Sequence, residues 1–568
     1  MRIYKSNITI SIPQDLNLTE LLHRSGEPNL HPSHLIAKDS LTNRSLTIGE
    51  LRERAGRIAN GLKTSYSPRD SSRWAVILPN SVEHLEVVHA VLWVGGVVCP
   101  INHAIKAEEI GHALSVTRPD FVIAYGPVTA KVLEGVDLAA RELKDSGIVW
   151  DVPEVITVIE RAGQYKHFPD DFFVSRKLAI PHYNDTKRFD ISLRTLINLA
   201  TIHLSSGTTG KPKGVELTHY NFISNVYQMR AHDATQFSRD TRVVAFTPYA
   251  HIANTTLPLF LGPFMGMMHH AMPSYDLETF GQLVESNKAT SFQGVPSVVL
   301  SFANTDITTR YDFSSAEVLN VGGLPFKKNI TDRLMSKAPW RLNQAYGMTE
   351  GAGYIAYQRV CDKLPEGVVG RFVPNIEAVL RINEGKDDAP EGGPGEMWLR
   401  GPNITRGYAF NPEANKSAFP RKGWYNTGDV CTISNNGVIA VVGRTKELIK
   451  YKGFQVSPTE LEGYLNSHPS VVEAAVGPVW DESQLTELPA AYVILKLNLV
   501  EEQDRKRALK EIHTAVDERV SGYKKLRGGV WEVKALPKNP TGKILRKQLK
   551  DQRSGLGSLN RDDRRAKL

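Results

Sequence analysis

The sequence predicts an α/β protein. A large N-terminal domain of several subdomains, with mainly parallel sheets covered by helices, is expected to precede a small, mobile α+β domain. Short apolar runs alternate with amphipathic segments through the first half of the chain, which is the pattern of parallel sheets buried on both faces. A chain of 568 residues is also too long to form a single core. After an apolar run at 438–442, a charged segment begins that is long enough for a separate domain.

Helix and strand signals alternate from residue 47 onward. Thr47 and Glu50 have the spacing of a capping box and predict a helix through Leu62. Asn80 is expected to cap a helix that ends near Val91. The other elements predicted here are strands at 74–78, 97–100 and 121–125 and a helix at 104–115.

The best domain boundary follows the strand expected at 438–442. We therefore divide the chain into an N-terminal domain (1–443), a C-terminal domain (444–550) and a flexible tail (551–568). The Gly- and Pro-rich segment 383–395 is interpreted as a loop and not as a boundary, because a strand resumes at 396–400.

Composition argues against several classes of protein. The chain is 41% hydrophobic and 23% charged, which is ordinary for a globular protein. Its three cysteines are far apart and form no C-x-x-C pair, which argues against a disulfide framework or a cysteine zinc site and favours a reducing compartment. We expect no secretory signal and no transmembrane segment. Most of the net charge of +8 lies in 543–568, so the nearly neutral main body argues against nucleic-acid binding.

The most informative stretch is the Gly-rich loop that begins at Ser205. A strand is expected before it, and Thr218 is expected to cap a helix after it. Glycines let backbone N–H groups approach an anion, hydroxyls donate hydrogen bonds and a lysine adds charge, so the loop predicts phosphate binding; the alternative is a flexible surface loop. Its spacing is not that of a P-loop NTPase. The predicted phosphate-binding residues are Ser205, Ser206, Gly207, Thr208, Thr209, Gly210 and Lys213.

This loop resembles the signature loop of the adenylate-forming superfamily, which includes acyl-CoA synthetases, luciferases and peptide-synthetase adenylation domains. Further segments resemble the motifs of that superfamily in its order, namely 248–254, 320–325, 344–350, 424–429, 443–455 and 537–546. The resemblance spans nearly the whole chain. It is closest to the 4-coumarate-CoA-ligase and luciferase-like branch, judging by 446–455.

The resemblance implies a site for ATP and Mg²⁺. Thr349 would meet the α-phosphate, and Glu350 would help to hold Mg²⁺, a hard cation that prefers carboxylate and phosphate oxygens. Asp429 and Arg444 would bind ribose. The remaining residues implied on the nucleotide side are Gly322, Gly323, Gln344, Tyr346 and Lys446.

The resemblance also implies how the acid and CoA are bound. His251 would close the carboxylate pocket, and Lys543 would hold the carboxylate and the α-phosphate. Lys446 would be the hinge, and Lys450, Lys452 and Gly453 would form the surface that meets the adenylate and CoA. The acyl pocket would be lined by Tyr249, Ile252, Ala253, Val295, Ala345 and Met348.

Two positions depart from the family pattern. Ser274 stands where many plant-type ligases have a basic residue after Met-Pro, which leaves one CoA-phosphate contact without its usual residue. Ala345 replaces the usual glycine before Tyr346, a change that narrows the acyl pocket.

The function implied by the resemblance is that of an AMP-forming acid–CoA ligase. Attack of a carboxylate on the α-phosphate of ATP gives an acyl adenylate and pyrophosphate, and a thiolate then displaces AMP. Positive charge from Mg²⁺, Lys213 and Lys543 would offset the charge at phosphorus. Rotation at Lys446 would exchange Lys543 for the surface of 450–452.

Several alternatives remain open at this point. A luciferase-like oxygenase and an enzyme that loads a carrier protein belong to the same superfamily, and an inactive nucleotide-binding scaffold is a remoter option. An aryl-propenoate and a medium-chain or secondary-metabolite acid fit the expected apolar pocket equally well.

The chain ends in Ala566, Lys567 and Leu568. This tripeptide resembles the Ser-Lys-Leu type of peroxisomal address, which a receptor reads. The sequence therefore predicts a peroxisomal protein that binds an import receptor, and a cytoplasmic one if the address is not used.

Overall fold

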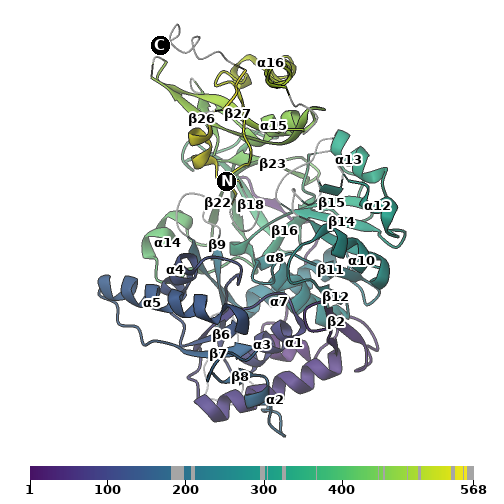
Figure 1. The fold of residues 1–568 in the computed structure, drawn as a ribbon, viewed down its shortest axis with the longest axis vertical. Helices are drawn as coiled ribbons and strands as arrows, with labels where there is room; N and C mark the ends of the chain where they lie inside the picture. Colours follow the sequence, from purple (N-terminus) through teal and green to yellow (C-terminus); the bar gives the residue numbers. More distant parts are fainter. Residues whose placement is uncertain are drawn as a thin grey trace.

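The computed structural model consists of a large lower body and a smaller upper body formed by the C-terminal part of the chain (Figure 1). Helices and strands alternate through the lower body, as the sequence predicted for an α/β protein. The structure describes residues 1–180, 198–205, 212–294, 298, 301–302, 305–322, 328–338, 340–365, 367–445, 447–451, 454–482, 484–496, 501–538, 544–553 and 555–558.

The first large sheet contains eight strands. Its central strands are parallel, and the antiparallel pairs lie at the edge that carries the Gly-rich loop. Across the sheet the strands are β21 (Gly407–Tyr408), β10 (Lys213–Thr218), β9 (Leu199–Ser205), β5 (Val97–Pro100), β4 (Arg73–Ile77), β6 (Phe121–Tyr125), β7 (Glu154–Val158) and β8 (His167–Phe168).

Helices cover both faces of this sheet, as its apolar strands require. Trp74 and Val76 of β4 pack into the core between the two large sheets, whereas Ala75 and Ile77 pack into an outer core. This alternation follows from the two-residue period of a strand. The inner helices are α1 (Leu18–Leu22), α2 (Ile48–Tyr66) and α3 (Val82–Trp93), and the outer helices are α4 (Ala107–Thr117) and α5 (Thr129–Asp145).

The second large sheet contains nine strands and is also parallel at its centre. Every residue of α3 is buried, and the helix contacts strands of both large sheets. Across the second sheet the strands are β17 (Arg371–Phe372), β16 (Gly353–Tyr357), β15 (Arg341–Met348), β14 (Val318–Gly322), β13 (Ser291–Gly294), β11 (Arg242–Ala245), β12 (Met268–Ala271), β2 (Leu35–Asp39) and β3 (Ser45–Thr47).

The two faces of the second sheet pack into different cores. Val243 and Ala245 join the core between the sheets, and Val244 joins an aromatic core on the outer side, where Phe280 and Phe292 pack edge to face. The inner elements are α7 (His219–His232), α8 (Ile252–Asn254), the π-helix η3 (Thr255–Leu261) and α9 (Gly262–Met265). The outer elements are α10 (Leu277–Asn287), α12 (Ile307–Arg310) and α13 (Lys328–Met335).

A third sheet, wholly antiparallel, completes the lower body. It carries Asp429 and Arg444 on neighbouring strands. Its strands are β1 (Tyr4–Lys5), β18 (Glu377–Ile382), β19 (Asp387–Asp388), β20 (Gly395–Arg400), β22 (Tyr425–Ile433) and β23 (Ile439–Arg444), and α14 (Pro412–Ala418) lies between β21 and β22 in the chain.

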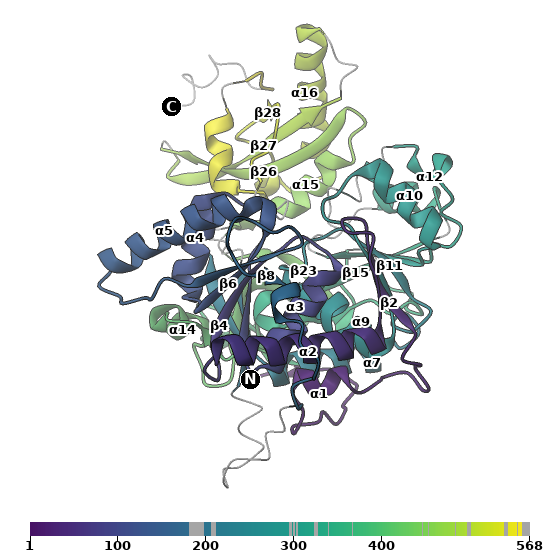
Figure 2. The same ribbon diagram turned by 60° about the horizontal axis from the view of Figure 1, so that its bottom comes forward.

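The C-terminal body has two hydrophobic cores of its own. Ile449 and Leu461 lie in one of them, and Trp531 and Leu549 lie in the other. Figures 1 and 2 both show this body above the rest. Its elements are β24 (Ile449–Tyr451), β25 (Phe454–Val456), α15 (Pro458–Asn466), β26 (Val471–Asp481), β27 (Thr486–Leu495), α16 (Glu502–Asp517), β28 (Val530–Glu532) and η6 (Arg546–Gln552).

The predicted capping box at Thr47 is confirmed. Thr47 accepts a hydrogen bond from the backbone N–H of Glu50, and the Glu50 carboxylate accepts one from the backbone N–H of Thr47. The predicted cap at Asn80 was wrong, because Ser81 caps α3 instead. Asn80 has another role: its side chain donates to the carbonyls of Ala245 and Thr247 and accepts the N–H of Tyr249. It thus joins the end of β4 to the loop that carries His251.

The start of the next helix was also predicted too early. The helix expected from residue 104 begins at Ala107. The side chain of Asn102 accepts the backbone N–H of Ala104, a local turn that competes with the helix. The strands predicted at 74–78, 97–100 and 121–125 correspond to β4, β5 and β6.

The predicted boundary at residue 550 lies inside a packed segment. Residues 546–552 form η6, Leu556 packs against the C-terminal core, and the backbone N–H of Ser558 bonds to Val530. The described part of the C-terminal body therefore extends through residue 558, beyond the tail boundary expected from the sequence.

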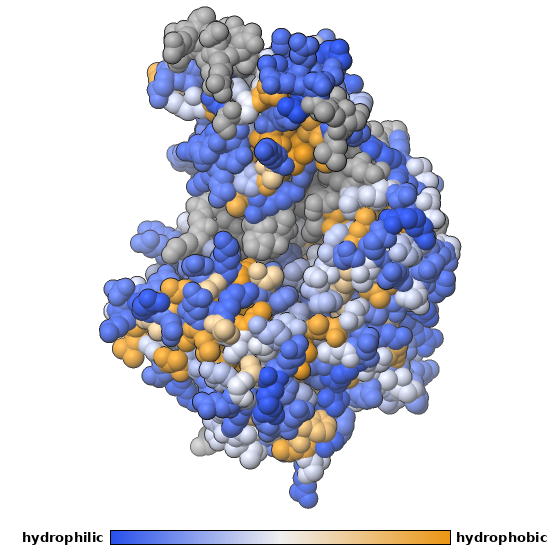
Figure 3. All heavy atoms as spheres, in the orientation of Figure 1, coloured by the Kyte–Doolittle hydropathy of each residue, from blue (hydrophilic) through white to orange (hydrophobic). Residues whose placement is uncertain are grey.

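The surface drawn in Figure 3 is mainly polar, with apolar residues in small groups. None of the helices in the described ranges has the length and apolar character needed to cross a membrane.

Candidate active site

Ser205 and Lys213 pair at the ends of β9 and β10, where these antiparallel strands lead into the Gly-rich loop. The rest of the predicted phosphate loop lies outside the described residues, namely Ser206, Gly207, Thr208, Thr209 and Gly210. The structure therefore positions the two ends of the loop, and its predicted phosphate contacts remain predictions.

The element after this loop differs from the sequence prediction. We expected the Gly-rich loop to lead into a helix, but strand β10 comes first. Val215 and Leu217 are buried and Glu216 between them is half-buried, an alternation that is typical of a strand. Thr218 does cap the helix that follows, as predicted, and forms a capping box with Asn221.

A buried carboxylate, Glu350, lies beside this strand pair. It is in the short 3-10 helix η4 (Thr349–Gly351) directly after β15. The hydroxyl of Tyr408 donates to Oε1 of Glu350 over 2.9 Å and lies 3.2 Å from the hydroxyl of Tyr425. The Nζ of Lys213 lies 4.9 Å from the centroid of the Tyr408 ring. Tyr408 thus contacts both the predicted phosphate-binding lysine and the predicted metal ligand.

A second polar group lies on the third sheet. The hydroxyl of Tyr346 donates to Oδ2 of Asp429 over 2.6 Å, and Nε of Arg444 lies 3.0 Å from Oδ1. Asp429 and Arg444 are direct partners across β22 and β23. The predicted adenine-side aromatic and the two predicted ribose-binding residues are therefore in contact with one another.

The electrostatics link the two groups. Burial raises the pKa of Glu350, whereas the hydrogen bond from Tyr408 and the charges of Arg444 and Lys213 act in the opposite direction. Burial acts to lower the pKa of Arg444, but the charges of Asp429 and Glu350 outweigh it and the pKa is raised. Two cations and two carboxylates thus face one region, an arrangement that suits a polyanion and a cation together.

His251 lies at the N-terminal end of α8. Its side chain is exposed, yet the protein around it desolvates the ring and lowers its pKa, so we expect a neutral imidazole at pH 7. A side chain that is exposed to solvent and yet desolvated by surrounding protein is typical of a residue that lines a hollow. A neutral histidine can donate one hydrogen bond and accept another.

A buried histidine supports the loop that carries His251. Nε2 of His203 lies 2.8 Å from the hydroxyl of Thr255, which donates to the carbonyl of Tyr249 over 2.7 Å. Burial lowers the pKa of His203 to about 3. Because the Thr255 proton is given to Tyr249, His203 is assigned as the Nε2–H tautomer. The strand before the phosphate loop is therefore joined to the loop before α8.

The predicted acyl-pocket residues divide into two groups. Ala253 and Met348 are partly exposed, whereas Ala345 is largely buried on β15, against which α8 packs. Tyr249 and Ile252 are fully buried, and the Tyr249 ring packs edge to face against His84 with centroids 5.5 Å apart. Tyr249 and Ile252 thus support the pocket from behind.

The predicted adenine side is described in part. Gly322 is exposed, and a Cβ added there would meet no atom within 4 Å. Gln344 is buried on the opposite face of its strand from Ala345, and its Oε1 has no hydrogen-bond partner within the described part of the chain. Both observations fit space for a ligand beside β14 and β15. Thr349, the predicted α-phosphate contact, is half-buried next to Glu350.

Family models match both bodies. One described as "AMP-binding enzyme" matches residues 28–409. A second, described as "AMP-binding enzyme C-terminal domain", matches residues 460–543. The chain belongs to the AMP-binding enzyme family.

Relatives of the AMP-binding family cover nearly the whole chain. Probable 4-coumarate–CoA ligase 3 of Dictyostelium discoideum is 30% identical over 537 residues, which are 92% of each chain. 4-Coumarate–CoA ligase-like 9 of Arabidopsis thaliana is 32% identical over 560 residues, which are 95% of this chain and 92% of that protein. These matches agree with the branch of the family to which the sequence motifs pointed.

Solved structures of this family have the same fold. An anthranilate CoA ligase in complex with anthranoyl-AMP has a TM-score of 0.81 at 22% identity, covering 95% of this chain and 98% of its own. The O-succinylbenzoate coenzyme A synthetase of Bacillus subtilis, in complex with ATP and magnesium, has a TM-score of 0.74 at 22% identity and covers 94% and 99%.

The structure does not bring every predicted residue of this AMP-binding enzyme to one place. Lys450 is exposed on β24, and its backbone groups bond to Glu487 and Thr486 of the C-terminal body. Besides those of the Gly-rich loop, the predicted residues that lie outside the described ranges are Val295, Gly323, Lys446, Lys452, Gly453, Lys543, Ala566, Lys567 and Leu568. Their roles stay predictions.

Three residues that contribute to the site were not predicted from the sequence, namely His203, Tyr408 and Tyr425. Tyr425 lies inside a recognised motif, two residues before Thr427, and could have been found there. His203 is the third residue from the end of β9, and its partner Thr255 is distant in sequence. Tyr408 reaches Glu350 only because β21 pairs with β10. These two contacts depend on the fold and leave no local signal.

The residues present fit a magnesium ion held mainly by the substrate. The described residues include no group of three or more side chains of the kind that hold a metal by themselves. Mg²⁺ typically keeps several waters and takes one or two carboxylates plus substrate phosphates. Glu350 beside Lys213 is a carboxylate of this kind.

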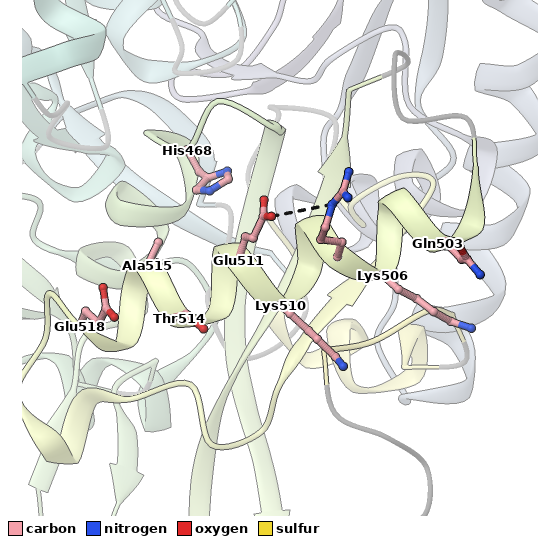
Figure 4. Close-up of a pocket in the computed structure, with 9 residues that line it drawn as sticks. His468, Gln503, Lys506, Lys510, Glu511, Thr514, Ala515 and Glu518 are labelled. Atoms are coloured by element: carbon pink, nitrogen blue, oxygen red, sulfur yellow. Dashed lines mark ion pairs between the residues drawn. The ribbon is translucent and has the colours of Figure 1, made fainter.

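A hollow of about 710 Å³ lies elsewhere, beside α16. Figure 4 shows that Lys506 and Lys510 extend from α16 away from His468 and that Glu511 pairs with a neighbouring arginine. The side chains that line this hollow carry charges of both signs, and none of the predicted catalytic residues is among them. We therefore place the active site at the Glu350 region and not here.

Proposed function

We propose that this AMP-binding enzyme activates a carboxylic acid with ATP and transfers the acyl group to CoA. The observation that carries the proposal is the arrangement of the predicted residues in two groups: Tyr408 contacts both Lys213 and Glu350, and Asp429 contacts both Tyr346 and Arg444.

In the first step, an oxygen of the carboxylate attacks the α-phosphorus of ATP and the bond to the bridging oxygen of pyrophosphate breaks. Asp429 accepts the ribose hydroxyls, and Lys213 offsets negative charge on the phosphates. Mg²⁺ held by Glu350 would neutralise phosphate charge that develops in this step. His251, as a neutral donor, would close the carboxylate pocket.

In the second step, the thiolate of CoA attacks the acyl carbon, and the bond between that carbon and the AMP oxygen breaks. Both nucleophiles are substrates, so no side chain needs to become acylated. The surface of 450–452 would face the acyl adenylate in place of Lys543.

Exchange of radiolabelled pyrophosphate into ATP tests the first step with a panel of carboxylic acids. We expect exchange that depends on the acid and, after CoA is added, an acyl-CoA thioester identified by mass spectrometry. An inactive scaffold would give no exchange with any acid. Light emission, or adenylate that a carrier-protein thiol consumes and CoA does not, would contradict the CoA-ligase assignment and support one of the alternatives.

We also propose that Ala566, Lys567 and Leu568 direct the protein to peroxisomes. The tripeptide has the small, basic and leucine order of a receptor-read address. Deleting these residues should leave both catalytic steps intact and change punctate fluorescence to diffuse fluorescence in a eukaryotic cell. Peroxisomal entry of the truncated chain, in cells without a full-length copy, would contradict the proposal.

A further inference from the structure

A chain of hydrogen bonds joins the three sheets of the lower body at Glu350. The hydroxyl of Tyr408 donates to Oε1 of Glu350 over 2.9 Å, and the hydroxyl of Tyr425 lies 3.2 Å from that of Tyr408. Tyr408 is on β21 of the first sheet, Tyr425 is on β22 of the third, and Glu350 is in η4, which directly follows β15 of the second. All three side chains are buried, so the chain lies where the sheets converge.

The direction of this chain follows from the chemistry of its members. An ionised carboxylate only accepts hydrogen bonds, so Tyr408 is the donor to Glu350. A tyrosine hydroxyl has a single proton, and Tyr408 has already given its proton to Glu350. Tyr425 therefore donates to the oxygen of Tyr408. This second bond keeps the Tyr408 proton on the side of Glu350.

The segment 403–408 also holds the backbone around Glu350. The N–H of Thr405 donates to the carbonyl of Glu350 over 2.7 Å, and the side-chain amide of Asn403 donates to the carbonyl of Gly351 over 2.8 Å. Asn403 is completely buried and Thr405 is nearly so. One segment that is distant in sequence thus fixes Glu350 at its main chain and at its carboxylate.

The same segment is attached to the strand that leaves the Gly-rich loop. Tyr408 pairs with Val215 across β21 and β10, and the hydroxyl of Thr405 donates to the carbonyl of Glu216 over 2.6 Å. The Nζ of Lys213, at the start of β10, lies 4.9 Å from the centroid of the Tyr408 ring. The position of Glu350 relative to the predicted phosphate-binding lysine is therefore set by this segment.

Glu350 is held firmly but is not neutralised by a direct partner. Buried charges in proteins are usually paired with an opposite charge. Within the described ranges, the side chain of Glu350 has the phenol of Tyr408 as its partner and forms no ion pair. A carboxylate that is oriented in this way, without a counter-ion of its own, fits a site that a cation enters together with a phosphate substrate.

We propose that Tyr408 is a positioning residue of the adenylation step: it fixes Glu350 beside Lys213 for the magnesium complex of ATP, and Tyr425 supports it through the second hydrogen bond. This inference rests on the proposed function, since it adds two residues to the same site. Neither tyrosine has to touch the substrate. Loss of a partner that orients a metal ligand typically costs about ten- to a hundredfold in metal affinity or activity.

Tyr408→Phe tests the hydroxyl alone, because this variant keeps the ring beside Lys213. At saturating ATP, the Mg²⁺ concentration for half-maximal pyrophosphate release should rise by roughly ten- to a hundredfold. Isothermal titration gives a readout that needs no turnover. The affinity for ATP should fall in the presence of Mg²⁺, whereas the affinities for ATP and AMP measured in EDTA should stay at their wild-type values.

Two further variants separate the contacts of Tyr408. Tyr425→Phe keeps the bond from Tyr408 to Glu350 but no longer fixes its proton, so the Mg²⁺ requirement should rise by a smaller factor, about threefold. Tyr408→Leu also removes the ring beside Lys213, and this variant should weaken ATP binding in EDTA as well.

Tyr66→Phe is the matched control. Tyr66 is the last residue of α2, and its hydroxyl donates to Oε1 of Glu154 over the same 2.9 Å, at an exposed position outside the site. Removal of this hydroxyl should change neither the Mg²⁺ requirement nor the affinity for either nucleotide.

Two results would overturn the proposal: an unchanged Mg²⁺ requirement in Tyr408→Phe, or a loss of AMP affinity as large as the loss of ATP affinity in Mg²⁺, which would show a general structural role. If Tyr408→Phe fails to fold, Tyr425→Phe decides, because an unchanged Mg²⁺ requirement in that variant would also overturn it. Absence of pyrophosphate release from the wild-type enzyme with every acid would reject the proposed function itself, whereas the titrations of ATP with Mg²⁺ would still test the two tyrosines.

Discussion

The proposed nucleotide site and the proposed CoA-facing surface are built in different ways. In the N-terminal body, Tyr346, Glu350 and Asp429 are buried and held by hydrogen bonds. In the C-terminal body, Lys450 is exposed on a short hairpin. A site that stabilises charge at phosphorus gains from fixed groups, whereas groups that act in a later step can be carried on a separate core and brought in.

The chain between the two bodies is tied on each side of the proposed hinge. Thr445 bonds to Glu396 of the third sheet over 3.0 Å. The Glu447 carboxylate pairs with Arg546 of the C-terminal body over 3.1 Å. Lys446 is the residue between them in sequence. A rotation at this point would leave both attachments intact, but it would break the hydrogen bonds that the backbone N–H groups of Glu447 and Leu448 donate to the carbonyl of Arg444.

The largest effect is expected at Lys543, the residue proposed to act only with the nucleotide site. Lys543→Ala should slow acyl-AMP formation by about a thousandfold and leave the conversion of supplied acyl-AMP and CoA within a few-fold of wild type. Rapid-quench assays of the two half-reactions measure this. Lys538→Ala is the control, because Lys538 in the same segment already pairs with Glu473. Equal loss of both half-reactions in a folded variant would count against the assignment.

Glu350→Gln should slow adenylation by about a hundredfold and raise the Mg²⁺ concentration that is needed. Glutamine has the same shape and can still accept the Tyr408 hydrogen bond, so the fold should persist. A Mg²⁺ titration of pyrophosphate release, together with Tm, checks both points. Glu377→Gln, which affects a surface pair with Arg400, should change neither. An unchanged Mg²⁺ dependence would remove Glu350 from the metal site.

A smaller effect is expected at His203. His203→Leu should raise the KM for the acid by about tenfold with little change in the KM for ATP, because it removes the hydrogen bond that joins Thr255, and through Thr255 the loop before His251, to β9. His203→Gln, which retains a donor, should recover most of the loss. If both variants raise the two KM values equally, His203 has only a general structural role.

The smallest effect is a loss of stability at mildly acidic pH. Burial lowers the pKa of His203 to about 3 and those of His84 and His219 to about 4, from the ordinary histidine value of 6.5. The unfolded state therefore binds protons first, so stability is fully present above pH 6.5 and falls as the pH decreases toward 4. The Tm should fall by a few degrees between pH 7 and pH 5, and less in His219→Gln. A higher Tm at pH 5 would contradict this.

Local signals predicted those parts of the fold that depend on local chemistry. The capping boxes at Thr47 and Thr218 were placed correctly because a cap is formed by residues a few positions apart. Asn80 was misassigned because its side chain bonds across the fold to the loop at 245–249. Strand β10 was not predicted, although Val215 and Leu217 are apolar and Glu216 between them is polar. This alternation is short and lies between a Gly-rich loop and a capped helix, so it is a weak signal for a strand.

The sequence motifs predicted the charged residues of the candidate site but not the contacts that join them. The motifs named Lys213, Glu350, Asp429 and Arg444, which the fold indeed places near one another. Their connection through Tyr408 depends on the pairing of β21 with β10, nearly two hundred positions apart. The hydrogen-bonded chain of Tyr425, Tyr408 and Glu350 was not predicted, because its members are carried by three different sheets.

In the mechanism proposed here, one active site performs two steps and the C-terminal body turns between them. Lys446→Pro tests this rotation, because proline fixes φ at the proposed hinge. Both half-reactions should be measured on this variant, with acyl-AMP quantified per enzyme molecule. We expect acyl-AMP to form and accumulate while its conversion to the thioester collapses. Thioester turnover at the wild-type rate would contradict a hinge at Lys446, because it would show that no rotation at this residue is needed.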